Sequence, residues 1–293
     1  MTMNHDPSLE RLAGAIDLHI HAAPDILPRK LDDLALARQA LEAGMRTIAL
    51  KSHFEPTAGR ARLATDATGM AVIGGVALNW PVGGLNHHAV EYALAMGARI
   101  VWLPTAHAAQ FLSERRHAPL LSGAAGRLSR GITLLNRNNR LVQAMPRILS
   151  LVAEHDAILA TGHVSVAEAR AVIRQAAAQG VGRILVTHPL ASFVGYSVAE
   201  MKEMLDLGAS YLEITYAETT PVMARPVPVT VLADAVRAVG PSHCIMSTDC
   251  GQSVNPPPVV AMARFMRDMT ECGFSEQAIR AMTVDNPARL LGL

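Results

Sequence analysis

Short apolar runs recur along the chain, separated by longer stretches in which apolar positions have helical spacing. The runs have the length of strands and predict them at 15–20, 46–51, 71–78, 99–103, 157–161, 183–187, 210–214 and 244–248. Alanine-rich amphipathic stretches between them predict helices, among them 32–43, 86–96, 166–179, 198–207, 228–238 and 257–271. This alternation is typical of repeated βα units around a parallel sheet.

Helix boundaries support the same organisation. Ser165 and Glu168 form a capping-box pattern, and Gly44, Gly97 and Gly208 stand where helices should end. No Ser/Gly-rich or Pro-rich linker divides the chain, and α/β barrels commonly reach about 250 residues as one unit. The sequence therefore predicts a single-domain (β/α)8 TIM barrel over residues 1–293.

The stretch 104–156 departs from the pattern. Residues 131–136 and 140–143 flank an Arg-Asn-Asn turn, which predicts a small hairpin. Before it, 105–130 is rich in Ala, Ser, Gly, His and Arg. A long loop at this point of a barrel would lie over the catalytic face, so we expect either a lid or an excursion without a role.

Histidines and one aspartate are the polar exceptions at the strand ends. His19 and His21 alternate on one strand, so both point to the same face. His163, His188 and Asp249 each follow a later apolar run closely. Each has a structural alternative: a core histidine bonded to backbone, a hydrogen bond at the start of a loop, or a loop cap. Together, imidazoles and a carboxylate form a ligand set for Zn²⁺ or a similar ion at the barrel mouth.

Composition indicates which kind of partner the protein binds and in which cellular compartment it works. The formal net charge of +1 does not favour nucleic acid or an anionic membrane, so we expect a small-molecule substrate. Residues 1–10 lack the apolar stretch of a signal peptide, and no apolar run approaches the length of a membrane span. The three cysteines form no CxxC, which favours a reduced, cytoplasmic location. The sequence is compatible with a homo-oligomer.

The ligand order carries a family resemblance. The HxH strand, followed by His163, His188 and Asp249 after later strands, resembles the amidohydrolase superfamily of metal-dependent hydrolases, as does the tail 285–293. The resemblance extends from about residue 15 to the end. It implies one or two divalent ions, zinc first with Mn, Fe or Co as alternatives, and hydrolysis of an amide, lactone or ester. A mononuclear decarboxylase or a non-catalytic metal-binding barrel are the alternatives.

One position departs from the family pattern. Binuclear members commonly carry a bridging lysine or glutamate at the end of the fourth strand, and 101–105 offers neither. Lys51, closing the second strand, is the replacement that we consider, either as a carboxylated bridge or as a clamp for a substrate carboxylate or a plain cation at the mouth. His53 lies two residues further on the same face and is expected to touch metal or substrate, or else the surface. Glu213 is expected to contact substrate.

The ligand chemistry predicts a mechanism. A divalent ion lowers the pKa of bound water to near 7 and polarises a carbonyl. Asp249 would accept the proton of that water and pass it to the leaving group. If one ion binds, His19, His21, His163 and Asp249 would hold it, which would free His188 to stabilise an oxyanion.

The substrate itself is not specified by any motif. Arg29 and Arg60 are candidates for binding an anionic substrate, and no pattern favours either. Cys250 lies beside Asp249 without a base that the sequence pairs with it, so we interpret it as a packing residue.

Overall fold

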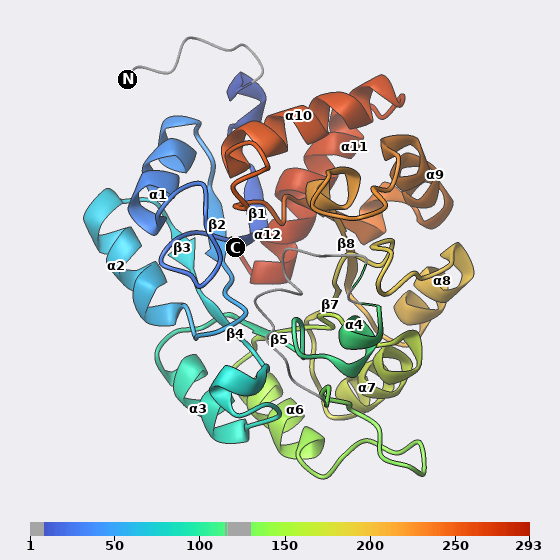
Figure 1. Ribbon diagram of the computed structural model, residues 1–293. Coiled ribbons are helices and arrows are strands. Elements are labelled where there is room, and N and C mark those ends of the chain that lie inside the picture. Colours follow the sequence, from blue (N-terminus) through green and yellow to red (C-terminus); the bar gives the residue numbers. More distant parts are fainter. Residues whose placement is uncertain (1–8, 115, 117–129) are drawn as a thin grey trace.

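The strands follow one another in parallel around a central axis in the computed structural model, which describes residues 9–114, 116 and 130–293 (Figure 1). In chain order they are β1 (Ile16–Ile20), β2 (Thr47–Leu50), β3 (Val72–Ile73), β4 (Gly75–Ala77), β5 (Ile100–Trp102), β6 (Ile158–Ala160), β7 (Ile184–Val186), β8 (Tyr211–Thr215) and β9 (Cys244–Ser247). Neighbours in sequence pair with each other, from β1 to β3 and from β4 to β9.

Two features close this sheet into a barrel. β3 and β4 are the two parts of the predicted strand 71–78, interrupted only at Gly74. At the other seam, the Asp249 amide donates to the His19 carbonyl and the His21 amide donates to the Cys250 carbonyl, both at 2.8 Å. The predicted (β/α)8 barrel is therefore confirmed.

Helices surround the strands (Figure 1). They are α1 (Asp33–Glu42), α2 (Ala58–Thr68), α3 (His87–Ala95), α4 (Ala109–Ser113), α6 (Met145–Glu154), α7 (Val166–Ala178), α8 (Val198–Asp206), α9 (Val229–Val239), α10 (Pro258–Glu271), α11 (Glu276–Arg280) and α12 (Asn286–Leu291). Short 3-10 turns are η1 (Leu9–Leu12), η2 (Trp80–Val82), η4 (Tyr216–Thr219) and η5 (Pro241–His243), and a π-helical turn, η6 (Ala281–Asp285), precedes α12. Within the described part of the chain, no helix is long and apolar enough to cross a membrane.

The predicted helix boundaries are confirmed. Ser165 accepts a hydrogen bond from the Glu168 amide and the Glu168 carboxylate accepts from the Ser165 amide, which starts α7 with a capping box. Gly44, Gly97 and Gly208 have φ of 72°, 94° and 115° just beyond α1, α3 and α8. These left-handed conformations suit glycine at helix ends.

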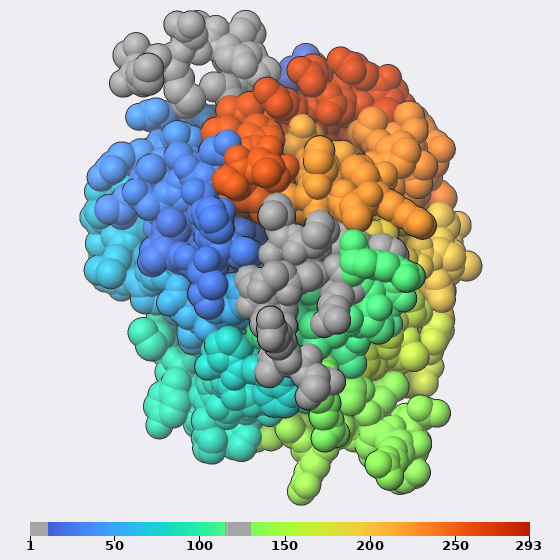
Figure 2. All heavy atoms as spheres, viewed as in Figure 1, coloured from blue at the N-terminus to red at the C-terminus, as the bar shows by residue number. Residues whose placement is uncertain are grey.

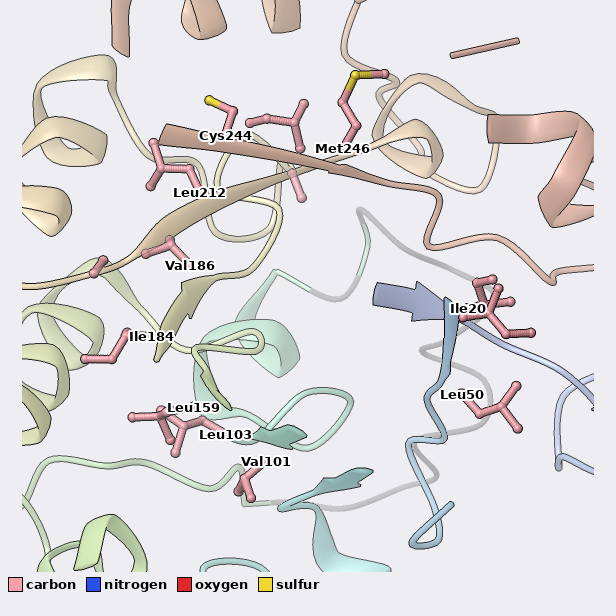
Figure 3. Close-up of a cluster of buried hydrophobic side chains, with 14 of the residues drawn as sticks. Ile20, Leu50, Val101, Leu103, Leu159, Ile184, Val186, Leu212, Cys244 and Met246 are labelled. Carbon is pink, nitrogen blue, oxygen red and sulfur yellow. The ribbon is translucent and has the colours of Figure 1, made fainter. Parts of the chain in front are cut away.

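Alternation along the strands divides the core into two layers. Outward side chains, such as Val101, Leu159 and Val186, pack under the helices (Figure 3). Inward side chains, such as Ile100 and Ile158, pack instead with the apolar residues of α12. Because these two begin their strands, α12 covers the end of the barrel at which the strands start. The opposite end is left for polar side chains.

Residues 104–156 differ in part from the prediction. The small hairpin is confirmed, since the Asn136 amide donates to the Arg140 carbonyl and the Val142 amide to the Leu134 carbonyl, both at 2.8 Å. The end of the stretch is not irregular, however, because α6 covers 145–154. Pro146 marks the first turn of this helix, where a missing amide hydrogen costs nothing. Most of the segment on which a lid was predicted, 115 and 117–129, lies outside the described residues.

Candidate metal centre

Asp17 fixes the strand that carries the two alternating histidines. Its carboxylate accepts hydrogen bonds from the His19 amide at 3.1 Å, the Thr248 amide at 3.1 Å and the Thr248 hydroxyl at 2.6 Å. These bonds tie β1 to the residues after β9 and bring the two strand ends together. Burial raises the pKa of Asp17 to about 7, against the hydrogen bonds from Thr248. No role was predicted for Asp17 from the sequence, although Asp17 alternates with the two histidines along the strand.

Three predicted ligands converge at this seam. The Nε2 atoms of His19 and His21 each lie 3.1 Å from the same oxygen, Oδ1 of Asp249. One ligand atom from each residue lies within 4.8 Å of the others, and all three residues are largely shielded from solvent. We call His19, His21 and Asp249 the donor cluster.

The ring of His19 is oriented by two charged side chains. Its Nδ1 lies 3.0 Å from Oε2 of Glu213, and its Nε2 lies 2.8 Å from Nζ of Lys51. Burial raises the pKa of Glu213, but attraction to His19 outweighs it and leaves this pKa below its ordinary value. An ionised Glu213 accepts a hydrogen bond from Nδ1–H of His19, which leaves Nε2 as the nitrogen that faces the centre of the site.

Glu213 lies behind His19 rather than in front of it. Its side chain is fully buried, and it is absent from the described lining of the pocket at the barrel mouth. This position suits orientation of His19 better than the substrate contact predicted from the sequence.

Lys51 reaches the centre as expected, over the ring of Trp102, with Nζ 5.5 Å from the ring centroid. Burial lowers the pKa of Lys51 to about 8, although the carboxylates of Asp249 and Glu213 act to raise it. Carboxylation of Lys51 stays a prediction.

Three further histidines complete an arc of rings. The His53 ring stacks on that of His21 at 4.8 Å between centroids and meets His163 edge-on at 5.8 Å. His163 lies 4.9 Å from His188, whose ring is 5.9 Å from that of His19. All five histidines singled out in the sequence are therefore brought to one end of the barrel. We call His163 and His188 the second histidine pair.

The second histidine pair has ring nitrogens without partners. Among the described residues, no hydrogen bond reaches the buried Nδ1 of His163 or either ring nitrogen of His188. Burial lowers the pKa of His188 to about 4 and holds the pKa of His163 well below its ordinary value. Both imidazoles are thus neutral at pH 7, with lone pairs available to a metal ion.

His53 is held by residues that the sequence analysis missed. Its Nδ1 lies 2.8 Å from the Thr105 hydroxyl, which also accepts from the Asn79 amide group at 2.6 Å. Asn79 donates further to the His53 carbonyl at 2.9 Å. No motif marks Asn79, because its partners lie on different loops.

The backbone at the strand ends is unusual at two of the predicted ligands. His188 and Asp249 have φ of 28° and 50°, which non-glycine residues rarely adopt and which cost about 1–3 kcal/mol each. The chain after Asp249 also passes close to β1, since a Cβ at Gly251 would lie 1.8 Å from the His21 carbonyl oxygen. Such conformations cluster at functional sites, where the surrounding structure holds them in place.

A pocket opens onto the donor cluster from the barrel mouth. Its described lining combines three histidines and an aspartate with an arginine, a glutamine and several apolar groups: His21, Leu27, Arg29, His53, His163, Phe193, Val222, Met223, Asp249 and Gln252. Figure 2 shows this face of the molecule, on which the blue segment after β1 meets the orange to red segment after β9.

The charges of the donor cluster fit a cation. Burial lowers the pKa of His19, but the Asp249 and Glu213 carboxylates attract a proton and raise this pKa to about 9. The same attraction, to His19 and His21, holds the pKa of Asp249 well below its ordinary value despite burial. A protonated His19 supplies positive charge to this buried carboxylate, and a divalent ion could take the place of that proton because the donor types match it.

Comparisons with known proteins agree with this architecture. Residues 14–213 match a family of unknown function, DUF6282. The chain belongs to this family. Among curated proteins no match was found.

Several solved structures have a fold similar to that of this chain. An amidohydrolase from Pseudomonas aeruginosa is 14% identical, aligns over 97% of both chains and has a TM-score of 0.66. An organophosphorus hydrolase from Deinococcus radiodurans is 15% identical over 97% of this chain and 94% of its own, with a TM-score of 0.59. A mutant of a PTE-like lactonase from the same organism is 14% identical over 97% of both chains, with a TM-score of 0.59. The expected resemblance to amidohydrolases is thus confirmed in the fold.

Proposed function

We propose that the protein is a metal-dependent hydrolase, which uses activated water to cleave an amide, lactone or ester bond of a small molecule. The observation that carries the proposal is the convergence of His19, His21 and Asp249 on one point beside two buried histidines with unpartnered nitrogens. The hydrolases and lactonases that share the fold support the reaction class by analogy.

The donor types indicate which ions the site would hold. Imidazole and carboxylate groups suit Zn²⁺, and also Mn²⁺, Fe²⁺ or Co²⁺. The donor cluster would hold one ion, and the second histidine pair would hold another or share the first. When bound, such an ion supplies a nucleophile at neutral pH by acidifying water and polarises the scissile carbonyl.

The chain supplies proton transfer and a shaped environment. Asp249 remains ionised and lines the pocket, so it can accept a proton from the attacking water and return it to the leaving group. Phe193 packs against the rings of His163 and His188, at 4.7 Å and 5.2 Å between centroids. This aromatic contact keeps bulk water from that side of the site and holds both imidazoles in place.

The test combines metal analysis with a substrate screen. We expect metal-dependent hydrolysis of at least one compound among small lactones, N-acyl amino acids and cyclic amides. Asp249→Asn should lower kcat about 10²–10⁴-fold, the range for loss of a general base. Its metal content should fall less, because an asparagine oxygen still reaches the ion. Asp66→Asn is the control, since Asp66 pairs with Arg62 on the surface.

Two results would change the assignment. Wild-type turnover by Asp249→Asn would remove this carboxylate from the reaction. Release of CO₂ in place of a hydrolysis product would make the protein a decarboxylase on the same barrel.

A further inference from the structure

Arg29 is a cation in the pocket wall that the proposed reaction does not use. It lies in the loop after β1. This loop is bonded to the segment after β9, because the Lys30 amide donates to the Gly251 carbonyl at 2.8 Å. The Arg29 side chain is only 1% exposed, yet it lines the pocket together with His21 and Asp249. A buried guanidinium needs hydrogen-bond acceptors for all of its nitrogens.

Asp25 holds Arg29 by one edge. The Asp25 carboxylate, itself 0% exposed, accepts from Nε at 2.9 Å and from Nη2 at 2.7 Å. Asp25 also accepts from the Leu27 amide at 3.1 Å, which fixes the loop around the pair. Within the described chain no hydrogen bond reaches the remaining nitrogen, Nη1. The guanidinium is thus oriented but not saturated.

Arg60, the other arginine considered from the sequence, has no guanidinium nitrogen left for a ligand. It donates to Asp33 at 2.7 Å and 2.8 Å, to two backbone carbonyls at 2.8 Å and 3.0 Å, and also to Glu55. Every guanidinium nitrogen is used, and Arg60 does not line the pocket. The contrast assigns a structural role to Arg60 and leaves Arg29 for a ligand.

The rest of the described pocket lining defines the other part of that ligand. Leu27, Phe193, Val222 and Met223 offer apolar surface, and Gln252 is the neutral polar residue. Asp249, the carboxylate that lines the pocket, is already engaged by both histidines of the donor cluster. An anionic group therefore has one favourable position outside the metal donors, at Arg29.

We propose that Arg29 binds a carboxylate of the substrate, and that the substrates are small molecules with an apolar body and a free carboxylate near the scissile bond. That the bound molecule is a substrate rests on the proposed hydrolase function. The anion-binding role of Arg29 itself rests on the pocket geometry alone.

Ligand binding tests Arg29 without turnover. N-acetyl-leucine and N-acetyl-leucinamide, which differ by the negative charge, are titrated calorimetrically into metal-stripped wild type and Arg29→Gln. We expect wild type to prefer the carboxylate, and Arg29→Gln to weaken its binding about 10–100-fold, as loss of a charged hydrogen bond implies. Affinity for the amide should not change. Arg29→Lys should keep part of the preference, and Arg62→Gln, on the surface, should keep all of it.

Kinetics on the metal-loaded enzyme form the second measurement. For whichever bond the enzyme hydrolyses, a substrate with a carboxylate is compared with its carboxamide counterpart. Arg29→Gln should raise KM for the charged member by a much larger factor than KM for the neutral member, with little change in kcat for the charged one.

The outcomes separate the two proposals. Equal binding of both ligands to wild type, or an unchanged preference in Arg29→Gln, overturns the role of Arg29. A wild type that prefers the carboxylate but hydrolyses nothing overturns the hydrolase function and leaves the anion site standing. Asp25→Asn gives a further check if Arg29→Gln does not fold, because it removes the internal carboxylate that competes for the guanidinium and should strengthen the preference for the charged ligand. An unchanged preference in Asp25→Asn would then overturn the role of Arg29.

Discussion

The two halves of the candidate metal centre are held in place by different interactions. The donor cluster is set by hydrogen bonds: Asp17 fixes the strand, and Glu213 and Lys51 lie on either side of the His19 ring. The second histidine pair is set by packing, since Phe193 touches both rings while three of their buried nitrogens have no partner in the described chain. The first half is therefore organised by its protein partners, whereas the second keeps unpartnered nitrogens.

This difference has a physical consequence. A charge-assisted hydrogen bond fixes both the tautomer and the direction of an imidazole, which supports tight binding of an ion. Aromatic packing fixes the plane of a ring but does not determine which nitrogen carries the proton. We therefore expect the donor cluster to retain its ion more strongly than the second histidine pair.

Removing each half in turn produces the largest expected effect. His19→Ala combined with His21→Ala should strip the protein of metal, because the remaining carboxylate lacks its nitrogen partners. His163→Ala combined with His188→Ala should leave about one equivalent, held by the donor cluster. Elemental analysis after dialysis against a weak chelator measures both.

A matched control separates ligand loss from general damage. His87→Ala with His88→Ala removes two adjacent histidines at the start of α3, of which His88 is well exposed, and should leave the metal content unchanged. Full metal content in the His19 and His21 double variant would place the site elsewhere. Complete loss in the His163 and His188 double variant would show that the two halves bind a single shared ion.

The same difference explains what the sequence could predict. His19 and His21 were identified because alternation is local, and His163, His188 and Asp249 because each follows a strand. Asp17 and Glu213 were not assigned their contacts, since these join residues 231 and 194 positions apart. Only closure of the barrel brings such partners together, and no local pattern encodes their distance.

Other differences have similar causes. The helix α6 was hidden by Pro146, which resembles a break when its position within the helix is unknown. Arg29 and Arg60 could not be ranked from the sequence, because each is one basic residue among many. Their partners in space distinguish them.

Changing Glu213 tests whether orientation of His19 matters for the donor cluster. Glu213→Gln keeps the size of the side chain but replaces the ionised acceptor that fixes Nδ1 of His19. Loss of a carboxylate behind a ligating histidine typically weakens metal affinity 10–100-fold, and we expect an effect of about that size. Competition with a chromogenic chelator measures the affinity. Glu203→Gln, which removes only a surface partner of Arg170, should change nothing.

The smallest expected effect comes from a second buried glutamate just beyond β8, which contrasts with Glu213. Burial raises the pKa of Glu218 to about 8, although its Oε2 accepts hydrogen bonds from the Thr215 amide and hydroxyl. The folded protein therefore holds a proton here that the unfolded chain releases at its ordinary value of 4.5. The stability due to this proton is complete below that value and is lost as pH rises toward 8.

Glu218→Gln imitates the protonated carboxyl and should remove this dependence. The free energies of unfolding of the variant and of wild type are measured in urea. The variant's value minus that of wild type should increase by about 1 kcal/mol per pH unit between pH 6 and 8. Glu271→Gln, at the exposed end of α10, should show a constant difference over the same range. If the Glu218→Gln difference were also constant, Glu218 would be ionised in the folded protein. The contrast between a charged Glu213 behind the ligand and a neutral Glu218 beyond it would then be wrong.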